Sequence, residues 1–170
     1  MLKKIFTEDE YYKLKSSNAL LLKTLELVTK LFEGKTDKAG LPYYNHLLKV
    51  YANVSEYDEK IIALLHDVVE DTDITFDNLK EYGYPDSILE ALKVLTKKKG
   101  EYYPDYIERI IESNNIQAMN VKLADLKHNI DINRIEKPTI NDYERINKRY
   151  IPAINKIQNK LEQIKESKIC

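Results

Sequence analysis

The sequence contains a single cysteine, Cys170, which is the last of its 170 residues. An intrachain disulfide is therefore impossible, and nothing indicates an oxidising compartment. The chain also lacks an excess of charge of either sign, because 27 basic residues oppose 28 acidic ones. A net charge of −1 gives no overall field that attracts nucleic acid or an anionic membrane. We therefore expect neither as a partner, and any basic recognition must be local.

Long apolar runs are missing as well. No segment approaches the roughly 20 apolar residues of a membrane span, and the stretch from Met1 to Phe6 is too short for a signal peptide. We expect a cytoplasmic protein. Only four glycines and five prolines interrupt the chain. This composition favours helices joined by short turns, and the length favours one all-α domain over residues 1–170.

Apolar periodicity and helix-boundary residues place the expected helices along the chain. Thr7 and Glu10 form a capping-box pattern, from which one helix or two extend to about Phe32. Pro152 should kink or interrupt the last helix. Between these, further helices are expected over residues 44–54, 58–70, 75–83, 85–96, 104–113 and 117–129, followed by a helical tail over about 139–165.

One stretch, LLHDVVEDT over residues 64–72, concentrates a histidine and three carboxylates. Residues three and four apart share a helix face, so His66 is expected beside Glu70, and Asp67 beside both Glu70 and Asp71. Such a cluster suits a divalent cation next to a carboxylate base. An alternative stays open at this point, because His66 also falls on the apolar stripe, where a histidine can be a hydrogen-bonded core residue.

A second polar cluster lies on the helix expected over 117–129, where Asp125 comes one turn before His128 and Asn129. A buried aspartate is costly unless it is paired or bound to metal. Asp125 could therefore be a metal ligand, or it could pair with Lys122 or cap a neighbouring helix. The remaining histidine, His46, lies near the start of the 44–54 helix, where a side chain can point into a cleft.

In order along the chain, His46, the His66-Asp67 pair and Asp125 resemble the H…HD…D pattern of the HD superfamily of metal-dependent phosphohydrolases. The blocks LPYYNH, ALLHDVVEDT and VKLADLKHN are similar, more specifically, to the hydrolase domain of the RelA/SpoT alarmone enzymes and their single-domain small alarmone hydrolase relatives. The motif-bearing core runs over about 38–131. No synthetase activity is expected, because 170 residues leave no room for that domain.

This resemblance implies an HD-type helical bundle and a metal-dependent phosphohydrolase. It makes His46, His66, Asp67 and Asp125 the metal ligands, with Mn²⁺ as the usual ion. We expect one divalent ion per chain, because centres with two metals recruit further histidines and only His128 remains.

The resemblance also assigns the chemistry around the ion. Glu70 and Asp71 match the catalytic pair, which orients or deprotonates water, while Lys38 and Asn129 are expected to bind the substrate. The implied activity is removal of the 3′-pyrophosphate of (p)ppGpp, the alarmone guanosine tetra- or pentaphosphate. Two alternatives remain: an HD phosphatase acting on another nucleotide, such as a nucleoside monophosphate or NADPH, and a non-catalytic nucleotide-binding HD domain.

Several positions depart from the alarmone pattern. Asp37 stands where those enzymes have an arginine that packs on guanine, and Asp131 and Ile132 replace an arginine and a threonine. Leu47 replaces the usual proline after the first histidine. The metal ligands survive these changes, whereas base and nucleotide specificity cannot be read from the motifs.

Overall fold

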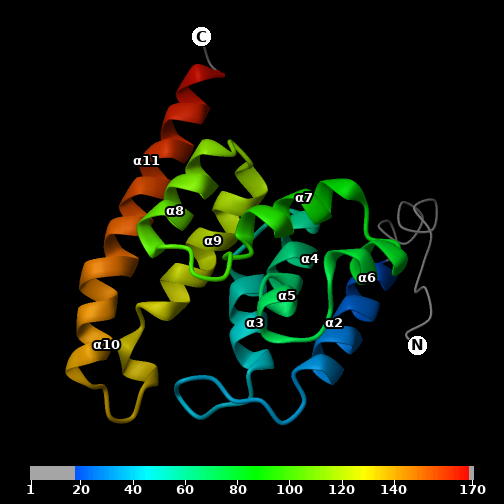
Figure 1. Cartoon of the computed structure of the whole chain (residues 1–170), viewed down its shortest axis with the longest axis horizontal. Coiled ribbons are helices and arrows are strands. Elements are labelled where there is room, and N and C mark those ends of the chain that lie inside the picture. Colours follow the sequence, from blue (N-terminus) through cyan, green and yellow to red (C-terminus); the bar gives the residue numbers. More distant parts are fainter. Residues whose placement is uncertain (1–17, 169–170) are drawn as a thin grey trace.

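The computed structural model describes residues 18–168, which form helices without any β-strand (Figure 1). This confirms the all-α prediction, while the expected capping box at Thr7 and Glu10 lies outside the described residues. The helices are α2 (Ala19–Leu31), α3 (Tyr44–Ala52), α4 (Tyr57–Leu65), α5 (Val68–Asp71), α6 (Phe76–Glu81), α7 (Asp86–Leu95), α8 (Tyr103–Glu112), α9 (Ile116–Asn129), α10 (Ile140–Arg145) and α11 (Ile151–Ser167), with a 3-10 turn η1 (Ile132–Arg134) and a π-helical turn η2 (Ile146–Tyr150).

Helix α4 lies at the centre of the fold and packs against α2, α3, α7 and α9 (Figure 1). Its second half, from Ile61 to Leu65, is fully buried on every side, as expected of a helix that other helices surround. The C-terminal helix α11 covers α8 and α9 along one side of the molecule. Within residues 18–168, none of the helices combines the length and apolar character needed to cross a bilayer.

The structure corrects the helix expected over residues 58–70. Helix α4 begins after Glu56, which forms a capping box with Glu59, and not at Asp58. It ends at Leu65, and α5 begins only after a turn through His66 and Asp67. Adjacent residues of a continuous helix point about 100° apart, so this break lets both side chains face the same site.

Other helix boundaries follow their local sequence. Thr75 caps α6 through a reciprocal capping box with Asn78, and Gly83 ends the following turn at φ 91°, where a side chain would be strained. Pro152 interrupts the C-terminal helical segment as predicted. The turn before it widens into the π-helical η2, which accommodates a proline ring that would clash with the carbonyl four residues earlier.

Candidate metal centre and substrate cavity

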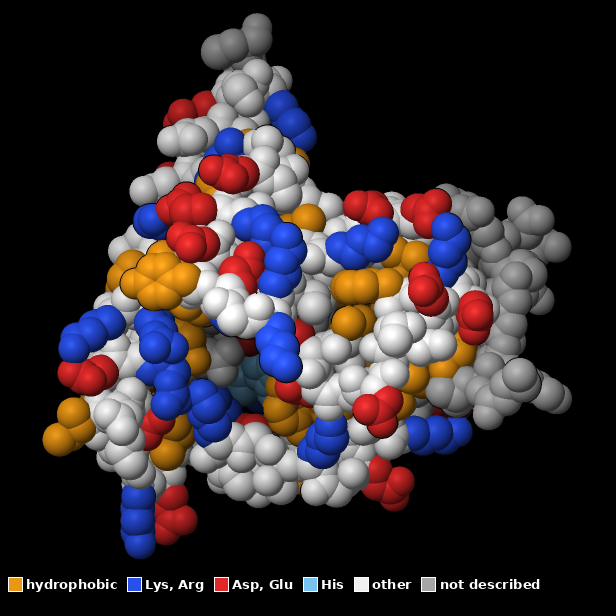
Figure 2. Space-filling view, viewed as in Figure 1, with side chains coloured by type: hydrophobic (Ala, Val, Ile, Leu, Met, Phe, Trp, Pro, Cys, Tyr) orange, Lys and Arg blue, Asp and Glu red, His pale blue; other side chains and the backbone are white. Residues whose placement is uncertain are grey.

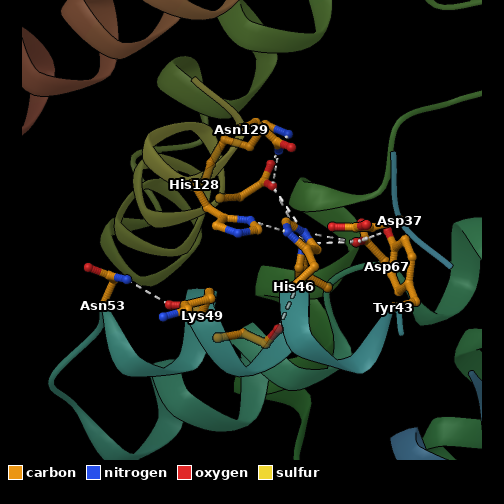
Figure 3. A network of polar contacts seen from close by, with 12 residues as sticks. Asp37, Tyr43, His46, Lys49, Asn53, Asp67, His128 and Asn129 are labelled. Atoms are coloured by element: carbon orange, nitrogen blue, oxygen red, sulfur yellow. Dashed lines mark hydrogen bonds and ion pairs between the residues drawn. The ribbon is translucent and has the colours of Figure 1, made fainter. Parts of the chain in front are cut away.

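Side chains from three packed helical segments meet at one end of the α3–α4–α9 contact (Figure 3). His46 comes from the first turn of α3, His66 and Asp67 from the break between α4 and α5, and Asp125 from α9. His46, His66 and Asp125 are each about 95% buried, with exposed fractions of 5%, 4% and 5%. The structure thus brings together all four residues that the sequence predicts as metal ligands.

The donor atoms of these residues lie close to one another. The Nε2 atom of His46 is 3.5 Å from Asp67 Oδ2 and 3.3 Å from Asp125 Oδ1, while the Nε2 atom of His66 is 3.1 Å and 3.9 Å from the same two oxygens. The two imidazole Nε2 atoms are 3.4 Å apart. Two nitrogens and two carboxylate oxygens therefore enclose a space a few ångströms across.

This donor set fits a divalent cation. Nitrogen and carboxylate ligands lie about 2.0–2.2 Å from a transition metal, which places neighbouring donors of a tetrahedral or octahedral ion about 3.0–3.5 Å apart. The observed separations of 3.1–3.9 Å are close to this range. Two carboxylates and two imidazoles suit a hard ion such as Mn²⁺ or a borderline ion such as Zn²⁺, and the carboxylates neutralise its charge.

Contacts behind the two histidines fix their orientation. The Nδ1–H of His66 donates to the carbonyl of Ala63 at 2.7 Å, so its Nε2 faces the cluster. The Nδ1 atom of His46 lies 2.7 Å from Nδ1 of His128. Burial and the nearby charge of His46 lower the pKa of His128 to about 4. A neutral His128 accepts the hydrogen bond from His46, which is the arrangement that aims a metal-binding imidazole.

The electrostatics of the cluster favour charged carboxylates and protonated imidazoles when no metal occupies it. Burial opposes charge on His46, but hydrogen bonds and attraction from Asp125 and Asp67 outweigh it and raise its pKa to about 9. The pKa of His66 is raised in the same way, mainly by Asp67. Burial disfavours the charged form of Asp67, but attraction and hydrogen bonds from His66 and His46 outweigh this and hold the pKa of Asp67 well below its usual range.

Asp125 pairs with Lys122, one of the alternatives that its sequence leaves open, and it also lies among the donor atoms of the cluster. Its Oδ1 faces the two imidazoles, while its Oδ2 accepts from the partly buried Lys122 ammonium at 2.8 Å. Despite burial, Lys122 and the histidines hold the pKa of Asp125 below its ordinary value. The amide of Asn129 also donates to Asp125 Oδ1, so Asn129 braces a proposed metal ligand in addition to lining the cavity.

A cavity of about 390 Å³ opens above the cluster and is lined by His46, Asp67 and Asp125 together with Glu70. Figure 2 shows this hollow with a histidine on its floor and lysine and arginine side chains around its rim. The Oε1 atom of Glu70 accepts the backbone N–H of Lys97 at 2.6 Å. Partial burial and the charge of Asp67 raise the pKa of Glu70, although the Lys97 hydrogen bond opposes the shift.

Asp71 points elsewhere. The hydroxyl of Tyr43 donates its single proton chiefly to Asp67 Oδ2 at 2.6 Å and lies 3.2 Å from Asp71 Oδ2. Tyr43 stacks on Phe32, with ring centroids 4.8 Å apart, so its hydroxyl is well fixed. The expected Glu70-Asp71 pair is therefore divided in this structure: Glu70 lines the cavity, whereas Asp71 contacts the cluster through Tyr43.

The far end of the cavity carries charged side chains from a loop and a turn. Lys38 lines it without a hydrogen-bonded or ion-paired partner among the described residues. Partial burial and the nearby Arg145 lower the pKa of Lys38. Next to it, Asp37 and Arg134 form an ion pair of 2.6 Å, with side chains only 8% and 12% exposed.

Comparison with known proteins identifies relatives over most of the chain. The guanosine-3′,5′-bis(diphosphate) 3′-pyrophosphohydrolase MESH1 of Danio rerio is 34% identical over 132 residues, which cover 70% of this chain and 72% of that protein. MESH1 of Drosophila melanogaster is 30% identical, over 75% of each chain. The chain belongs to the guanosine-3′,5′-bis(diphosphate) 3′-pyrophosphohydrolase family.

Other comparisons agree on the fold. The bifunctional (p)ppGpp synthase/hydrolase SpoT of Escherichia coli K12 is 27% identical over 78% of this chain, but the match spans only 22% of SpoT. The solved structure of a metazoan orthologue of SpoT that hydrolyses ppGpp superposes with a TM-score of 0.66 at 24% identity, covering 84% of this chain and 85% of its own. No family model matches the chain.

Membership of this hydrolase family confirms the relationship that the three sequence blocks predict. Together with the His46, His66 and Asp125 cluster, it indicates a divalent metal site. Sequence reasoning missed Tyr43 and Arg134. Tyr43 lies three residues before His46 and could have been found as its neighbour on one helical face, whereas Arg134 is 97 residues from its partner and carries no local signal.

Proposed function

We propose that the chain is a metal-dependent (p)ppGpp 3′-pyrophosphohydrolase. In this reaction water adds to the phosphorus bonded to the ribose 3′-oxygen, the bond between that oxygen and the pyrophosphate breaks, and the ribose oxygen takes up a proton. The products are GDP or GTP and pyrophosphate. The observation that carries the proposal is the convergence of four metal-type donor atoms on the floor of a cavity that is also lined by a carboxylate outside this donor set, Glu70.

His46, His66, Asp67 and Asp125 would hold the cation, and Mn²⁺ is the ion we propose. A divalent ion supplies Lewis-acid chemistry when bound, because it neutralises phosphoryl charge and acidifies water. The protein's own contribution begins with the hydrogen bonds behind the imidazoles, which keep both Nε2 atoms facing inward.

Glu70 is the proposed general base. Glu70 lines the cavity and does not belong to the four-residue donor set. Its Oε1 atom accepts the backbone N–H of Lys97. A raised pKa brings this carboxylate closer to the working pH, where a general base is most effective. A purely structural metal site has no need of such a carboxylate, which argues against the non-catalytic alternative.

Lys38 is the proposed phosphate contact, because it is a cation at the cavity wall with no anionic partner of its own among residues 18–168. Asn129 also lines the cavity, and we propose that it contacts the nucleotide while its amide braces Asp125.

The proposal is tested by incubating the purified chain with ppGpp and Mn²⁺ and resolving the products by ion-exchange chromatography. The expected products are GDP and pyrophosphate in equal amounts, and both should disappear when a chelator is added. GTP, GMP and NADPH serve as competing substrates in parallel. Orthophosphate from any of these at a higher rate, or no product from ppGpp, would contradict the proposal.

A further inference from the structure

The ion pair between Asp37 and Arg134 joins two segments that are far apart in the sequence. Asp37 lies on the loop between α2 and α3, and Arg134 ends the 3-10 turn that follows α9. Both residues line the cavity above the metal cluster. Nothing in the packing of the core requires a charged pair here, and burying such a pair contributes little to stability on its own.

Asp37 is held rigidly. Its Oδ1 atom accepts the backbone N–H groups of Ala39 and Leu41 at 2.8 and 3.0 Å, which leaves Oδ2 for the guanidinium of Arg134. A second guanidinium nitrogen of Arg134 donates to the side-chain oxygen of Asn129 at 3.3 Å. The planar fork of Arg134 is therefore fixed from two sides before any substrate binds.

Arg134 nevertheless keeps donors to spare. A guanidinium has five N–H groups, and these contacts use two of them. One of the remaining three, on Nε, is buried without a hydrogen-bond partner among the described residues, so the donors open to a ligand in the cavity are the spare N–H groups of the two Nη atoms. An arginine left with unmatched donors on the wall of a cavity is a group prepared for a ligand that brings acceptors.

The charges of the residues around Arg134 indicate which part of a nucleotide would contact it. Asp37 neutralises Arg134, so the pair has little net attraction for phosphate. Lys38, which lines the same cavity, has no such ion pair within residues 18–168 and is the stronger phosphate site. The neutral, planar pair instead suits an uncharged group with acceptors at fixed spacing.

We infer that Arg134, anchored by Asp37, is the specificity-determining residue that reads the base of the substrate and selects guanine. This inference rests on the proposed nucleotide hydrolysis. Guanine presents two acceptors on one edge, O6 and N7, which match an arginine fork. Adenine presents an amino donor in place of O6, and this donor would face the donors of Arg134. Asp37, on the loop between α2 and α3, fixes the guanidinium, and Arg134, on the turn after α9, contacts the base.

The test compares ppGpp with its adenine counterpart, adenosine 5′-diphosphate 3′-diphosphate, in the full chain. Two quantities are measured: kcat/KM with Mn²⁺, and the Kd of each nucleotide for chelator-treated protein. Arg134→Lys keeps the charge and can keep the pair with Asp37, but it loses the planar fork. Arg134→Gln removes the charge. Lys93→Gln, at an exposed position on α7, is the control for loss of a cation.

Wild-type protein and the control should prefer guanine in both measurements. Both Arg134 variants should lose this preference by about tenfold to a hundredfold, and Arg134→Lys should do so with an unchanged melting temperature. A preference that survives in Arg134→Lys, or wild-type protein that binds both nucleotides equally, overturns the inference. Failure of the proposed function looks different, because pyrophosphate release from ppGpp would then be absent while the binding measurement still reports base preference.

Discussion

At the metal end of the cavity, the proposed ligands lie on α3, on α9 and at the break after α4, all next to fully buried core residues. At the other end, Asp37, Lys38 and Arg134 lie on a loop and a 3-10 turn. Helices packed on several sides hold donor atoms to within fractions of an ångström, which metal binding requires. Loops tolerate substitution. The comparison explains how the ligand set can match the family pattern while the substrate end departs from it.

The largest effect at the metal end of the cavity is expected from removing one of the proposed metal ligands. Asp125→Ala should abolish metal binding and activity, because the remaining donors are incomplete and Lys122 loses its partner. The melting temperature should no longer rise with metal, and at a metal concentration of 100 times Kd this loss corresponds to about 2.7 kcal/mol. Metal content is measured by atomic emission, with Glu162→Ala on the exposed side of α11 as the control. Unchanged metal content and an unchanged shift of the melting temperature with metal would leave Asp125 only its structural pairing with Lys122.

Glu70→Gln should separate ligation from catalysis within the metal end. Glutamine preserves size and hydrogen bonding but cannot accept the proton, so kcat should fall by roughly 10²–10⁴ with metal content unchanged. Asp71→Asn should lose less, because Asp71 reaches the cluster only through Tyr43. Steady-state kinetics and metal analysis on the same preparations check this. Near-normal turnover at full metal occupancy would remove Glu70 from the mechanism.

Tyr43→Phe tests whether residues that hydrogen-bond to the proposed ligands contribute to metal binding. The hydroxyl fixes Asp67 at 2.6 Å, so its removal should weaken metal affinity or activity by about 10- to 100-fold while the stacked ring stays in place. Competition with a fluorescent chelator gives the affinity. Tyr44→Phe, which alters the exposed neighbour, is the matched control. Equal affinity and activity in Tyr43→Phe and its control would show that Asp67 needs no such support.

The smallest expected effect is on pH dependence, and it concerns the metal end alone. The pKa of His46 in the metal-free protein is raised from 6.5 to about 9. Its stabilising charge is therefore fully present below pH 6.5 and lost as pH rises towards 9. A cation competes with that proton, so metal affinity should increase over the same interval. Calorimetry at pH 7.5 in two buffers of different ionisation enthalpy should detect release of about one proton or more per metal. Binding without proton release would contradict the assignment.

The sequence identified most residues that line the cavity, Lys38 and Asn129 among them, but not the contacts that hold them in place. The ordered motifs identified His46, His66, Asp67 and Asp125, because residue type and order along the chain are visible without knowledge of the fold. The break between α4 and α5 escaped prediction, since residues on both sides favour helix and only the tertiary site requires the turn. The contact of Arg134 with Asp37 depends on how the ends of α3 and α9 approach each other. No local pattern encodes that approach.

The most direct test of the account titrates metal-free protein with Mn²⁺ and follows pyrophosphate release from ppGpp. Four donor residues enclosing one small space predict a single catalytic ion. Activity should rise in proportion to added metal and stop rising at one equivalent per chain, with GDP as the only nucleotide product. A break at two equivalents, or pyrophosphate release that persists without metal, would contradict the account.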